Sequence, residues 1–123
     1  MLKGIGVDIV KIQRIDDLLK NKGEKFLSRI FTTYEIENGD KNPSFFAKRF
    51  AAKEAFAKAL GCGIGSNISF TDIEVRNNSN GTPYIVCHND NYKHYSSMLS
   101  LSDEDEYAVA MVVIYDTVNK VIT

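Results

Sequence analysis

The sequence has 123 residues, of which 44% are hydrophobic and 25% charged, with a formal net charge of −1, as expected for one small soluble domain. No apolar run approaches the length of a membrane span, and the first residues lack the long apolar core of a signal peptide. Cys62 and Cys87 lie far apart without metal-ligand spacing, which favours free thiols and a cytoplasmic location.

The charged residues are unevenly distributed along the chain. Residues 1–60 hold twelve Lys and Arg against eight Asp and Glu, whereas residues 61–123 hold three against eight. This asymmetry predicts a basic surface for an acidic partner or for phosphate groups. It is too mild to indicate nucleic acid binding, and no pattern of stacking aromatic residues accompanies it.

Leu2–Val10 is predicted to be a strand whose residues alternate between two faces. One face carries Ile5, Val7 and Ile9, and the other carries Gly4, Gly6 and Asp8. The two glycines leave the Asp8 side thinly covered and allow something to approach the backbone closely. A carboxylate inside an apolar strand is unfavourable unless it is paired or holds a metal. The alternative is an exposed acid on an edge strand.

Two helical segments follow, one ending before Gly23 and one over residues 26–31. Their basic side chains are Lys11, Arg14, Lys20, Lys22, Lys25 and Arg29. They form either a solvated helix face or a docking surface for an acidic protein. Thr32 and Glu35 fit a capping box at the start of a short helix that ends near Gly39.

The strongest helical pattern runs from Pro43 to Leu60, with Asn42 as its N-cap and Gly61 as its left-handed C-cap. Glu54 and Lys58 share one face at a spacing of four. The other charged residues of this helix are Lys48, Arg49 and Lys53, and a loop containing Gly61, Gly63 and Gly65 follows. One carboxylate among four cations suits either a solvated face with one ion pair or a bound polyanion and its metal.

After this helix the hydrophobic period changes to two, which indicates strands at Ile68–Val75, Pro83–Cys87, Met98–Ser102 and Tyr107–Tyr115. Asn80-Gly81 is a hairpin signal. Residues 88–97 have no clear period and allow a short helix. The predicted fold is α+β, with helices packed on an antiparallel sheet in one domain over residues 1–123.

Asp8 and Glu54 combine expected burial with neighbours suited to phosphate. Two carboxylates together with substrate phosphates are the usual way in which proteins hold Mg²⁺. Lys53 and Lys58 would neutralise a diphosphate, and backbone N–H groups around Gly61–Gly65 could meet a further oxyanion. This set of residues favours phosphoryl-type chemistry catalysed by placement and electrostatics.

The chain resembles bacterial holo-acyl-carrier-protein synthase. The resemblance is carried, in order, by Gly4–Val10, Arg14-Ile15, Arg29–Thr32 with Glu35, Arg49–Gly61, Phe70–Val75, Asn80-Gly81 and Pro83. It implies a phosphopantetheinyl transferase that moves 4′-phosphopantetheine from coenzyme A to a serine of apo acyl carrier protein, in support of fatty acid biosynthesis. It also implies Mg²⁺ dependence and a homotrimer that binds coenzyme A in clefts between subunits.

The resemblance also implies roles for individual residues. Asp8 and Glu54 match the metal ligands, and Lys58 matches the lysine that stabilises or protonates the departing phosphate. Arg49 and Lys53 match phosphate contacts, and Arg14 matches a carrier-protein contact. We extend the expected docking surface for acyl carrier protein to Lys20, Lys22, Lys25 and Arg29, all in the same basic region.

One departure from the family pattern lies near the C-terminus. The family commonly has Ser-x-Ser/Thr-His, and this chain has Ser100-Leu101-Ser102-Asp103. An anionic Asp103 cannot hold a coenzyme A phosphate as a histidine would. Asp103 leaves open a non-catalytic binder of coenzyme A or carrier protein, and a metal-dependent hydrolase of a nucleotide diphosphate is a separate alternative. The general base also stays open among Glu54, Asp8 and a metal-bound water.

Overall fold

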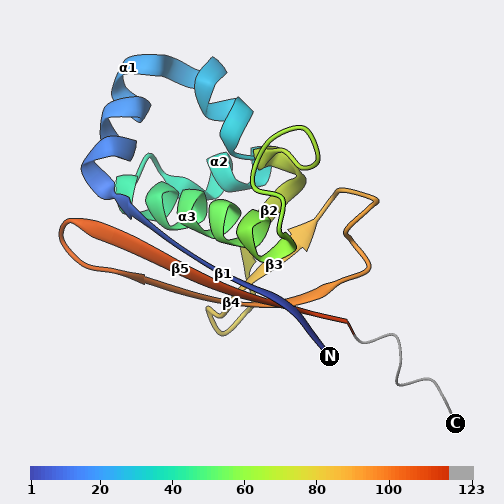
Figure 1. Ribbon diagram of the computed structural model, residues 1–123. Helices are drawn as coiled ribbons and strands as arrows, with labels where there is room; N and C mark the ends of the chain where they lie inside the picture. The colour runs from blue at the N-terminus through green and yellow to red at the C-terminus, as the bar shows by residue number, and fades with distance from the viewer. Residues whose placement is uncertain (117–123) are drawn as a thin grey trace, which may run out of the picture.

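Helix α3 (Pro43–Leu60) crosses the middle of the molecule, and the other elements are arranged around it (Figure 1). The computed structural model describes residues 1–116. In chain order the remaining elements are β1 (Leu2–Lys11), α1 (Ile12–Ile30), α2 (Thr33–Gly39), the 3₁₀ helix η1 (Phe70–Asp72), β2 (Ile73–Asn77), β3 (Pro83–Cys87), β4 (Ser96–Asp103) and β5 (Tyr107–Tyr115).

The predicted bounds and caps of α3 are confirmed. The Asn42 side chain accepts hydrogen bonds from the N–H groups of Ser44, at 2.9 Å, and Phe45, at 3.2 Å, and Gly61 ends the helix at φ 86°. Most of its buried residues are alanines and phenylalanines, so α3 is enclosed around much of its circumference. Helices that are buried on most sides lack a single apolar stripe. None of the helices within residues 1–116 is long and apolar enough to cross a membrane.

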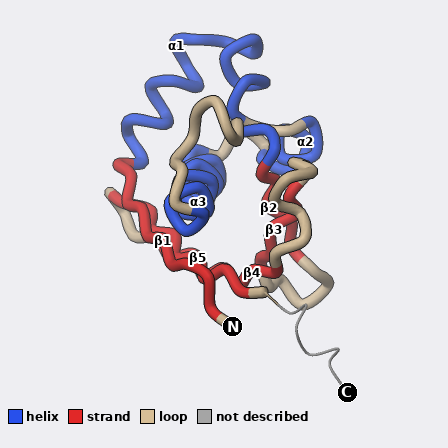
Figure 2. Tube along the Cα trace, turned by 45° about the vertical axis from the view of Figure 1, so that its right-hand side comes forward, coloured by secondary structure: helices blue, strands red, loops and turns tan. Residues whose placement is uncertain are grey.

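The strands form two antiparallel sheets that curve around α3 (Figure 2). The larger sheet has the order β1-β5-β4, which makes β1 an edge strand, and β2 and β3 form the smaller sheet. In the larger sheet, Gly6 lies opposite Val112 and Asp8 opposite Ala110. The α+β prediction is therefore confirmed, with two sheets in place of the one that we expected.

Helix α1 is continuous except at Gly23, where φ is 75° and ψ is −174° and the chain bends. The two expected helical segments are thus the two arms of one bent element. Glycine adopts this conformation without the strain that a Cβ would cause. The capping box of α2 is also confirmed, because the Thr32 hydroxyl accepts from the Glu35 N–H and the Glu35 carboxylate accepts from the Thr32 N–H.

Three predictions of secondary structure were wrong in detail. The strand expected from Ile68 begins only at Ile73, because residues 70–72 form η1, with Ser69 bonded to the Asp72 carboxylate. The short helix allowed over residues 88–97 is absent: residues 90–94 form turns, since the Asn89 side chain accepts from the Asn91 N–H and closes a local turn, and β4 begins at Ser96. Strand β4 begins at Ser96 and ends at Asp103, longer than expected at its N-terminal end by two residues and at its C-terminal end by one.

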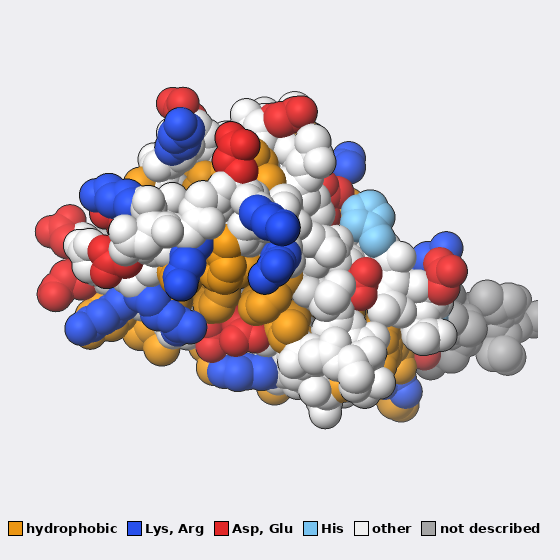
Figure 3. Space-filling model, turned by 90° about the horizontal axis from the view of Figure 1, so that it is seen from above, with side chains coloured by type: hydrophobic (Ala, Val, Ile, Leu, Met, Phe, Trp, Pro, Cys, Tyr) orange, Lys and Arg blue, Asp and Glu red, His pale blue; other side chains and the backbone are white. Residues whose placement is uncertain are grey.

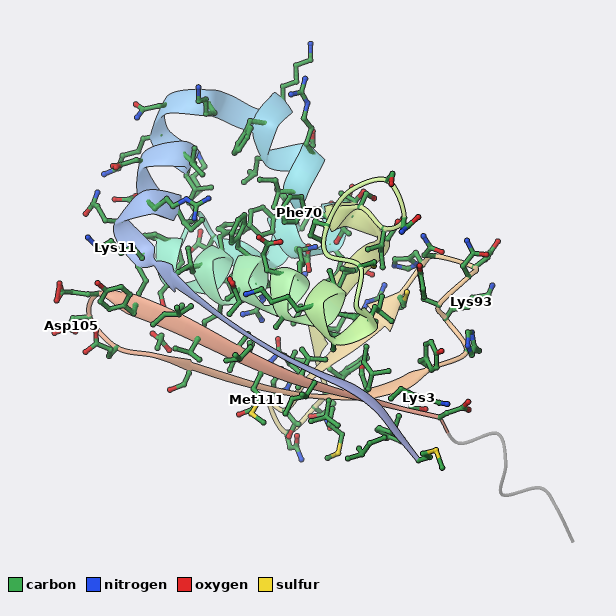
Figure 4. The ribbon with its side chains drawn as sticks, viewed as in Figure 1. Lys3, Lys11, Phe70, Lys93, Asp105 and Met111 are labelled. Carbon is green, nitrogen blue, oxygen red and sulfur yellow. The ribbon has the colours of Figure 1, made fainter. Side chains whose placement is uncertain are left out.

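The prediction that Gly4 and Gly6 leave the Asp8 side of β1 thinly covered was wrong. Helix α3 lies against that side, and the uncovered side is the opposite one. There, large apolar side chains from three strands are each 44–66% exposed, namely Ile5, Val7, Ile9, Met98 and Met111. Figure 4 shows Met111 below the sheet, pointing away from the helices. We call this surface the outer apolar face.

Candidate functional site

The candidate site lies where β1 contacts α3, and two glycines set how closely the two elements approach. A Cβ at Gly4 would lie 1.9 Å from the Ala59 carbonyl oxygen, and one at Gly6 would lie 2.0 Å from the Ala55 carbonyl oxygen. No real Cβ tolerates such distances, so only glycine permits this contact. Asp8 follows two residues after Gly6 on the same face of the strand, so its carboxylate is brought to the surface of α3.

Lys58 of α3 reaches across to this carboxylate. Its Nζ lies 3.1 Å from Asp8 Oδ1 and 3.1 Å from the carbonyl oxygen of Val7. The side chain of Lys58 is 54% exposed and that of Asp8 is 16% exposed. The ion pair therefore lies at the surface, with one partner partly withdrawn from water.

Glu54 lies one helical turn before Lys58 and is partly buried. Burial raises the pKa of its carboxyl group, the negative charge of Asp8 raises it further, and the positive charges of Lys58 and Arg14 oppose the shift. Asp8 and Glu54 thus lie close enough to repel one another. A pair of neighbouring carboxylates of this kind favours the binding of a cation.

Arg14 enters the site from α1, which the sequence alone did not predict. Its guanidinium carbon lies 5.4 Å from the centre of the Phe50 ring, and its charge acts on Glu54. Arg14 is exposed, so it can also contact a partner at the edge of the same site. The prediction had placed Arg14 with the carrier protein and not beside the carboxylates.

Lys53 does not lie where a phosphate could reach it, and this part of the predicted site requires correction. Its side chain is 0% exposed, and its Nζ lies 2.8 Å from Glu35 Oε1, whose side chain is also 0% exposed. The same ammonium donates hydrogen bonds to the carbonyl oxygens of Phe70, at 3.0 Å, and of Ile73. All three of its donors are therefore used inside the protein.

Arg49 is also buried, at 5% exposure, but it retains an unpaired donor. Its Nη2 donates to the Asn77 side chain at 2.7 Å, and its guanidinium lies over the Phe45 ring at 3.6 Å. Its Nε has no hydrogen-bond partner among the described residues. Burial lowers the pKa of Arg49, although Glu35 opposes this shift.

The glycine-rich loop after α3 is shaped by backbone conformation, with φ of 86° at Gly61 and 68° at Gly63. We expected its N–H groups to meet an oxyanion, but three of them are engaged within the chain. Gly61 donates to the Lys58 carbonyl, Gly63 to the Ala57 carbonyl and Gly65 to the Ile68 carbonyl, at 2.9–3.1 Å. These three glycines therefore give the loop its shape, and their N–H groups are not free donors.

The basic side chains of α1 are exposed on both sides of the Gly23 bend, and Figure 3 shows Lys and Arg beside apolar and acidic side chains on this face. Arg14 precedes the bend, and Lys25 and Arg29 follow it, so these residues do not form one straight row. Lys20 is paired with Asp16 at 3.1 Å. Lys22 is exposed immediately before Gly23.

Asp103 is bound to the start of α3. One of its oxygens accepts a hydrogen bond from the Ser44 hydroxyl at 2.7 Å, and the other lies 3.3 Å from Lys48 Nζ. These two contacts lower the pKa of Asp103 despite an opposing effect of burial. Its negative charge is therefore compensated locally by a lysine.

The chain is similar to known proteins in sequence and in fold. A family described as the 4′-phosphopantetheinyl transferase superfamily matches residues 4–112. A holo-[acyl-carrier-protein] synthase of Ehrlichia chaffeensis is 50% identical over 121 residues, which cover 94% of this chain and 98% of the relative.

Two solved structures are similar along nearly their whole length. The holo-(acyl-carrier-protein) synthase of Bacillus anthracis, in complex with coenzyme A (3′,5′-ADP), has a TM-score of 0.83 and 41% identity over 95% of this chain and 99% of that one. The synthase of Helicobacter pylori, in complex with coenzyme A, has a TM-score of 0.84 and 37% identity over 90% of this chain and 99% of that one. The fold is thus that of proteins that bind coenzyme A.

Proposed function

The chain belongs to the 4′-phosphopantetheinyl transferase superfamily, and from this premise we propose that it is a holo-acyl-carrier-protein synthase. It transfers 4′-phosphopantetheine from coenzyme A to a serine of apo acyl carrier protein and releases adenosine 3′,5′-bisphosphate. The observation that carries the proposal is the meeting of Asp8, Glu54 and Lys58 where β1 contacts α3. This arrangement joins two adjacent carboxylates to a half-exposed cation at the surface.

Asp8 and Glu54 are the residues that would hold Mg²⁺. No cluster of three or more His, Cys, Asp or Glu side chains suited to a metal occurs within residues 1–116. Mg²⁺ would take the two carboxylates and complete its shell with water and substrate phosphate. An ammonium group already lies against Asp8, so this position accepts a cation. When bound, Mg²⁺ would offset the negative charge of the diphosphate under attack.

The protein's own cations would supply the rest of the electrostatic stabilisation. The side chain of Lys58 is half exposed, so its ammonium could stabilise the negative charge on the phosphate that leaves with the adenosine bisphosphate. Arg49 would supply a second phosphate contact; it is buried at 5% exposure, and its Nε has no hydrogen-bond partner among the described residues. The serine of the carrier protein must lose a proton, and Asp8 and Glu54 are the nearby carboxylates available to accept it.

The direct test is to incubate the protein with apo acyl carrier protein, coenzyme A and Mg²⁺ and to weigh the carrier by intact-mass spectrometry. The proposal predicts a carrier heavier by one phosphopantetheine group and an equal amount of adenosine 3′,5′-bisphosphate. Cleavage of coenzyme A without modification of the carrier would instead indicate a hydrolase. Binding of coenzyme A with no cleavage would indicate a non-catalytic binder.

We place the active form in a homotrimer with a coenzyme A cleft shared between subunits. The outer apolar face supports this assembly, because contiguous exposed apolar surface of this kind usually marks a protein interface.

The two cysteines are free and partly buried, in keeping with a reducing, cytoplasmic environment.

Light scattering tests the assembly. Ile5→Lys, on the outer apolar face, should convert a trimer into monomers, whereas Lys93→Glu, in an exposed turn, should leave the mass unchanged. A wild-type protein that is monomeric at micromolar concentration and fully active would contradict the trimer.

The acid-rich carrier protein is expected to dock on the exposed cations of α1, namely Arg14, Lys20, Lys22, Lys25 and Arg29. Exposed charges mainly set the rate of encounter and the register, and their reach is about 8 Å at physiological ionic strength. Salt should therefore lower kcat/KM for the carrier more than the affinity for coenzyme A. Arg14→Glu should act in the same direction, with Lys93→Glu as control.

A further inference from the structure

The ammonium of Lys58 lies against two oxygen atoms that could also bind a metal cation. Its ammonium lies 3.1 Å from a carboxylate oxygen of Asp8 and 3.1 Å from the Val7 carbonyl oxygen, both on the edge strand β1. Carboxylate and carbonyl oxygens are also the ligands that hard divalent cations take in proteins. The ammonium and a metal ion would thus compete for the same Asp8 oxygen.

Helical spacing adds Glu54 to this competition. Glu54 precedes Lys58 by four residues on α3, so the two side chains lie on the same face of the helix, and Glu54 lies within the electrostatic reach of Asp8. The ammonium of Lys58 pairs with Asp8, and its charge also acts on Glu54, a second carboxylate that Asp8 repels. It balances one of their two charges.

The side chain of Lys58 is able to leave this position. It is 54% exposed, and both of its partners lie on one side of it, across the contact between α3 and β1. A lysine ammonium is a compact charge on a flexible four-carbon chain, so a small rotation of the side chain moves it away from Asp8 into the solvent. The pairing is thus a surface contact that exchanges easily.

We propose that Lys58 is the internal counter-ion of the Asp8–Glu54 site and that a divalent cation displaces its ammonium from Asp8. This inference rests on the proposed function for its metal site. Its consequence is a coupling of two events, because the binding of the metal would release a cation beside the position of the substrate phosphates. Lys58 would then be available to a phosphate only after the metal has bound.

The helix offers a matched control. Lys48 lies ten residues before Lys58 on α3, and it too pairs with an aspartate of the larger sheet, Asp103, at 3.3 Å. Asp103 has a hydroxyl donor, Ser44, as its second partner, and no carboxylate among the described residues contributes to the shift of its pKa. Removal of the Lys48 charge should thus have no effect on a metal at Asp8.

The test is a titration of the folded protein with Mn²⁺, without coenzyme A, in which electron paramagnetic resonance measures free Mn²⁺. Lys58→Met and Lys58→Gln should bind Mn²⁺ about two- to fivefold more tightly than the wild type, the range that one partly exposed ion pair is worth. Lys58→Arg, which keeps the cation, and Lys48→Met should bind as the wild type does. The metal-free Lys58→Met protein should also gain more thermal stability from Mn²⁺ than the wild type gains at the same concentration.

Two outcomes overturn the inference. The first is an unchanged or weaker Mn²⁺ affinity in both Lys58→Met and Lys58→Gln, and the second is an equal tightening in Lys48→Met. Asp8→Asn separates this inference from the metal site itself. If the wild type binds Mn²⁺, Asp8→Asn does not, and the Lys58 variants match the wild type, the proposed function stands and the counter-ion role fails. Absence of binding in every variant contradicts both.

Discussion

Two of the lysine–carboxylate pairs on helix α3, Lys53–Glu35 and Lys58–Asp8, differ mainly in burial. Lys53 and Glu35 lie 2.8 Å apart with both side chains 0% exposed, whereas Lys58 and Asp8 lie 3.1 Å apart with side chains 54% and 16% exposed. The two lysines are five residues apart on one helix. Their environments nevertheless assign the first pair to the fold and the second to the site.

The hydrogen bonds of the two ammonium groups explain the difference. Lys53 uses its three donors on Glu35 and on the carbonyl groups of Phe70 and Ile73, so it joins α2, α3 and the start of β2. Glu35 in turn accepts from the Val75 N–H at 2.7 Å. Burial lowers the pKa of Lys53, and its contacts with Glu35 oppose that shift. These hydrogen bonds hold the side chains of Lys53 and Glu35 in one position. By contrast, one N–H of the Lys58 ammonium stays available to solvent or substrate.

The largest effect on stability is expected from Lys53→Met, which leaves the Glu35 carboxylate buried without its cation. Loss of one partner of a buried pair lowers the free energy of unfolding by about 3–5 kcal/mol. Urea unfolding at fixed protein concentration measures this change. Lys58→Met, at the exposed pair, should lower the free energy of unfolding by no more than about 1 kcal/mol.

A second substitution distinguishes unpaired charge from lost packing. Lys53→Met combined with Glu35→Gln removes the uncompensated charge and keeps an amide oxygen for the Val75 N–H. The double variant should recover part of the stability that Lys53→Met loses. If it is less stable than Lys53→Met, the buried charge is not the cause of the loss.

A smaller loss of stability, of about 1–3 kcal/mol, is expected from Gly6→Ala, because overpacking forces β1 away from α3. This shift also moves Asp8 relative to Glu54 and Lys58, so the rate of transfer should fall while the far-ultraviolet circular dichroism stays native. Gly65→Ala is the matched control for stability, since nothing lies within 4 Å of its added Cβ. Full activity in a folded Gly6→Ala protein would refute the role of this close contact.

The sequence predicts most of the exposed pair and little of the buried one. Glycine at every second position before Asp8 indicates a close approach, and a spacing of four places Glu54 and Lys58 on one helix face. Which element makes the approach depends on the fold: the sequence left the approaching group open, and the structure shows that it is α3. The alternation of residues along β1 did not tell us which face of the sheet α3 covers.

Lys53 and Glu35 illustrate the other failure. The pattern of α3 shows Lys53 among alanines, and charged residues on a helix are usually solvated. Its partner Glu35 is eighteen residues away and was explained fully by its capping role, which is confirmed. Only the packing of α2 against β2 shows that the same carboxylate has a second use. Lys53, which is adjacent to the candidate metal ligand Glu54 in sequence, was therefore assigned wrongly to the substrate.

The smallest effect concerns the pH dependence of the metal-free protein. The pKa of Glu54 in the folded state is raised above its ordinary value of 4.5, first by burial and then by Asp8. Ionisation of Glu54 therefore destabilises the fold, and this destabilisation is absent below about pH 4.5 and grows as the pH rises through the folded-state pKa. Glu54→Gln should thus gain stability relative to the wild type across that interval. Urea unfolding between about pH 4 and pH 8 measures the difference.

Glu37→Gln, an exposed position on α2, is the control for that series. Mg²⁺ should reverse the sign of the comparison at neutral pH, because it stabilises the ionised wild-type site and not the Glu54→Gln variant. A stability difference that is constant with pH would show that Glu54 ionises in the fold as it does in the unfolded chain.

The account as a whole depends on the assignment of the exposed pair to catalysis, and the single-turnover rate of phosphopantetheine transfer by Asp8→Asn tests it most directly. The substitution keeps the shape of the side chain and removes one charge from the site. We predict that transfer to apo acyl carrier protein slows by about a hundredfold or more at limiting Mg²⁺, while the urea midpoint stays close to that of the wild type. A folded Asp8→Asn protein that transfers at the wild-type rate would contradict the account.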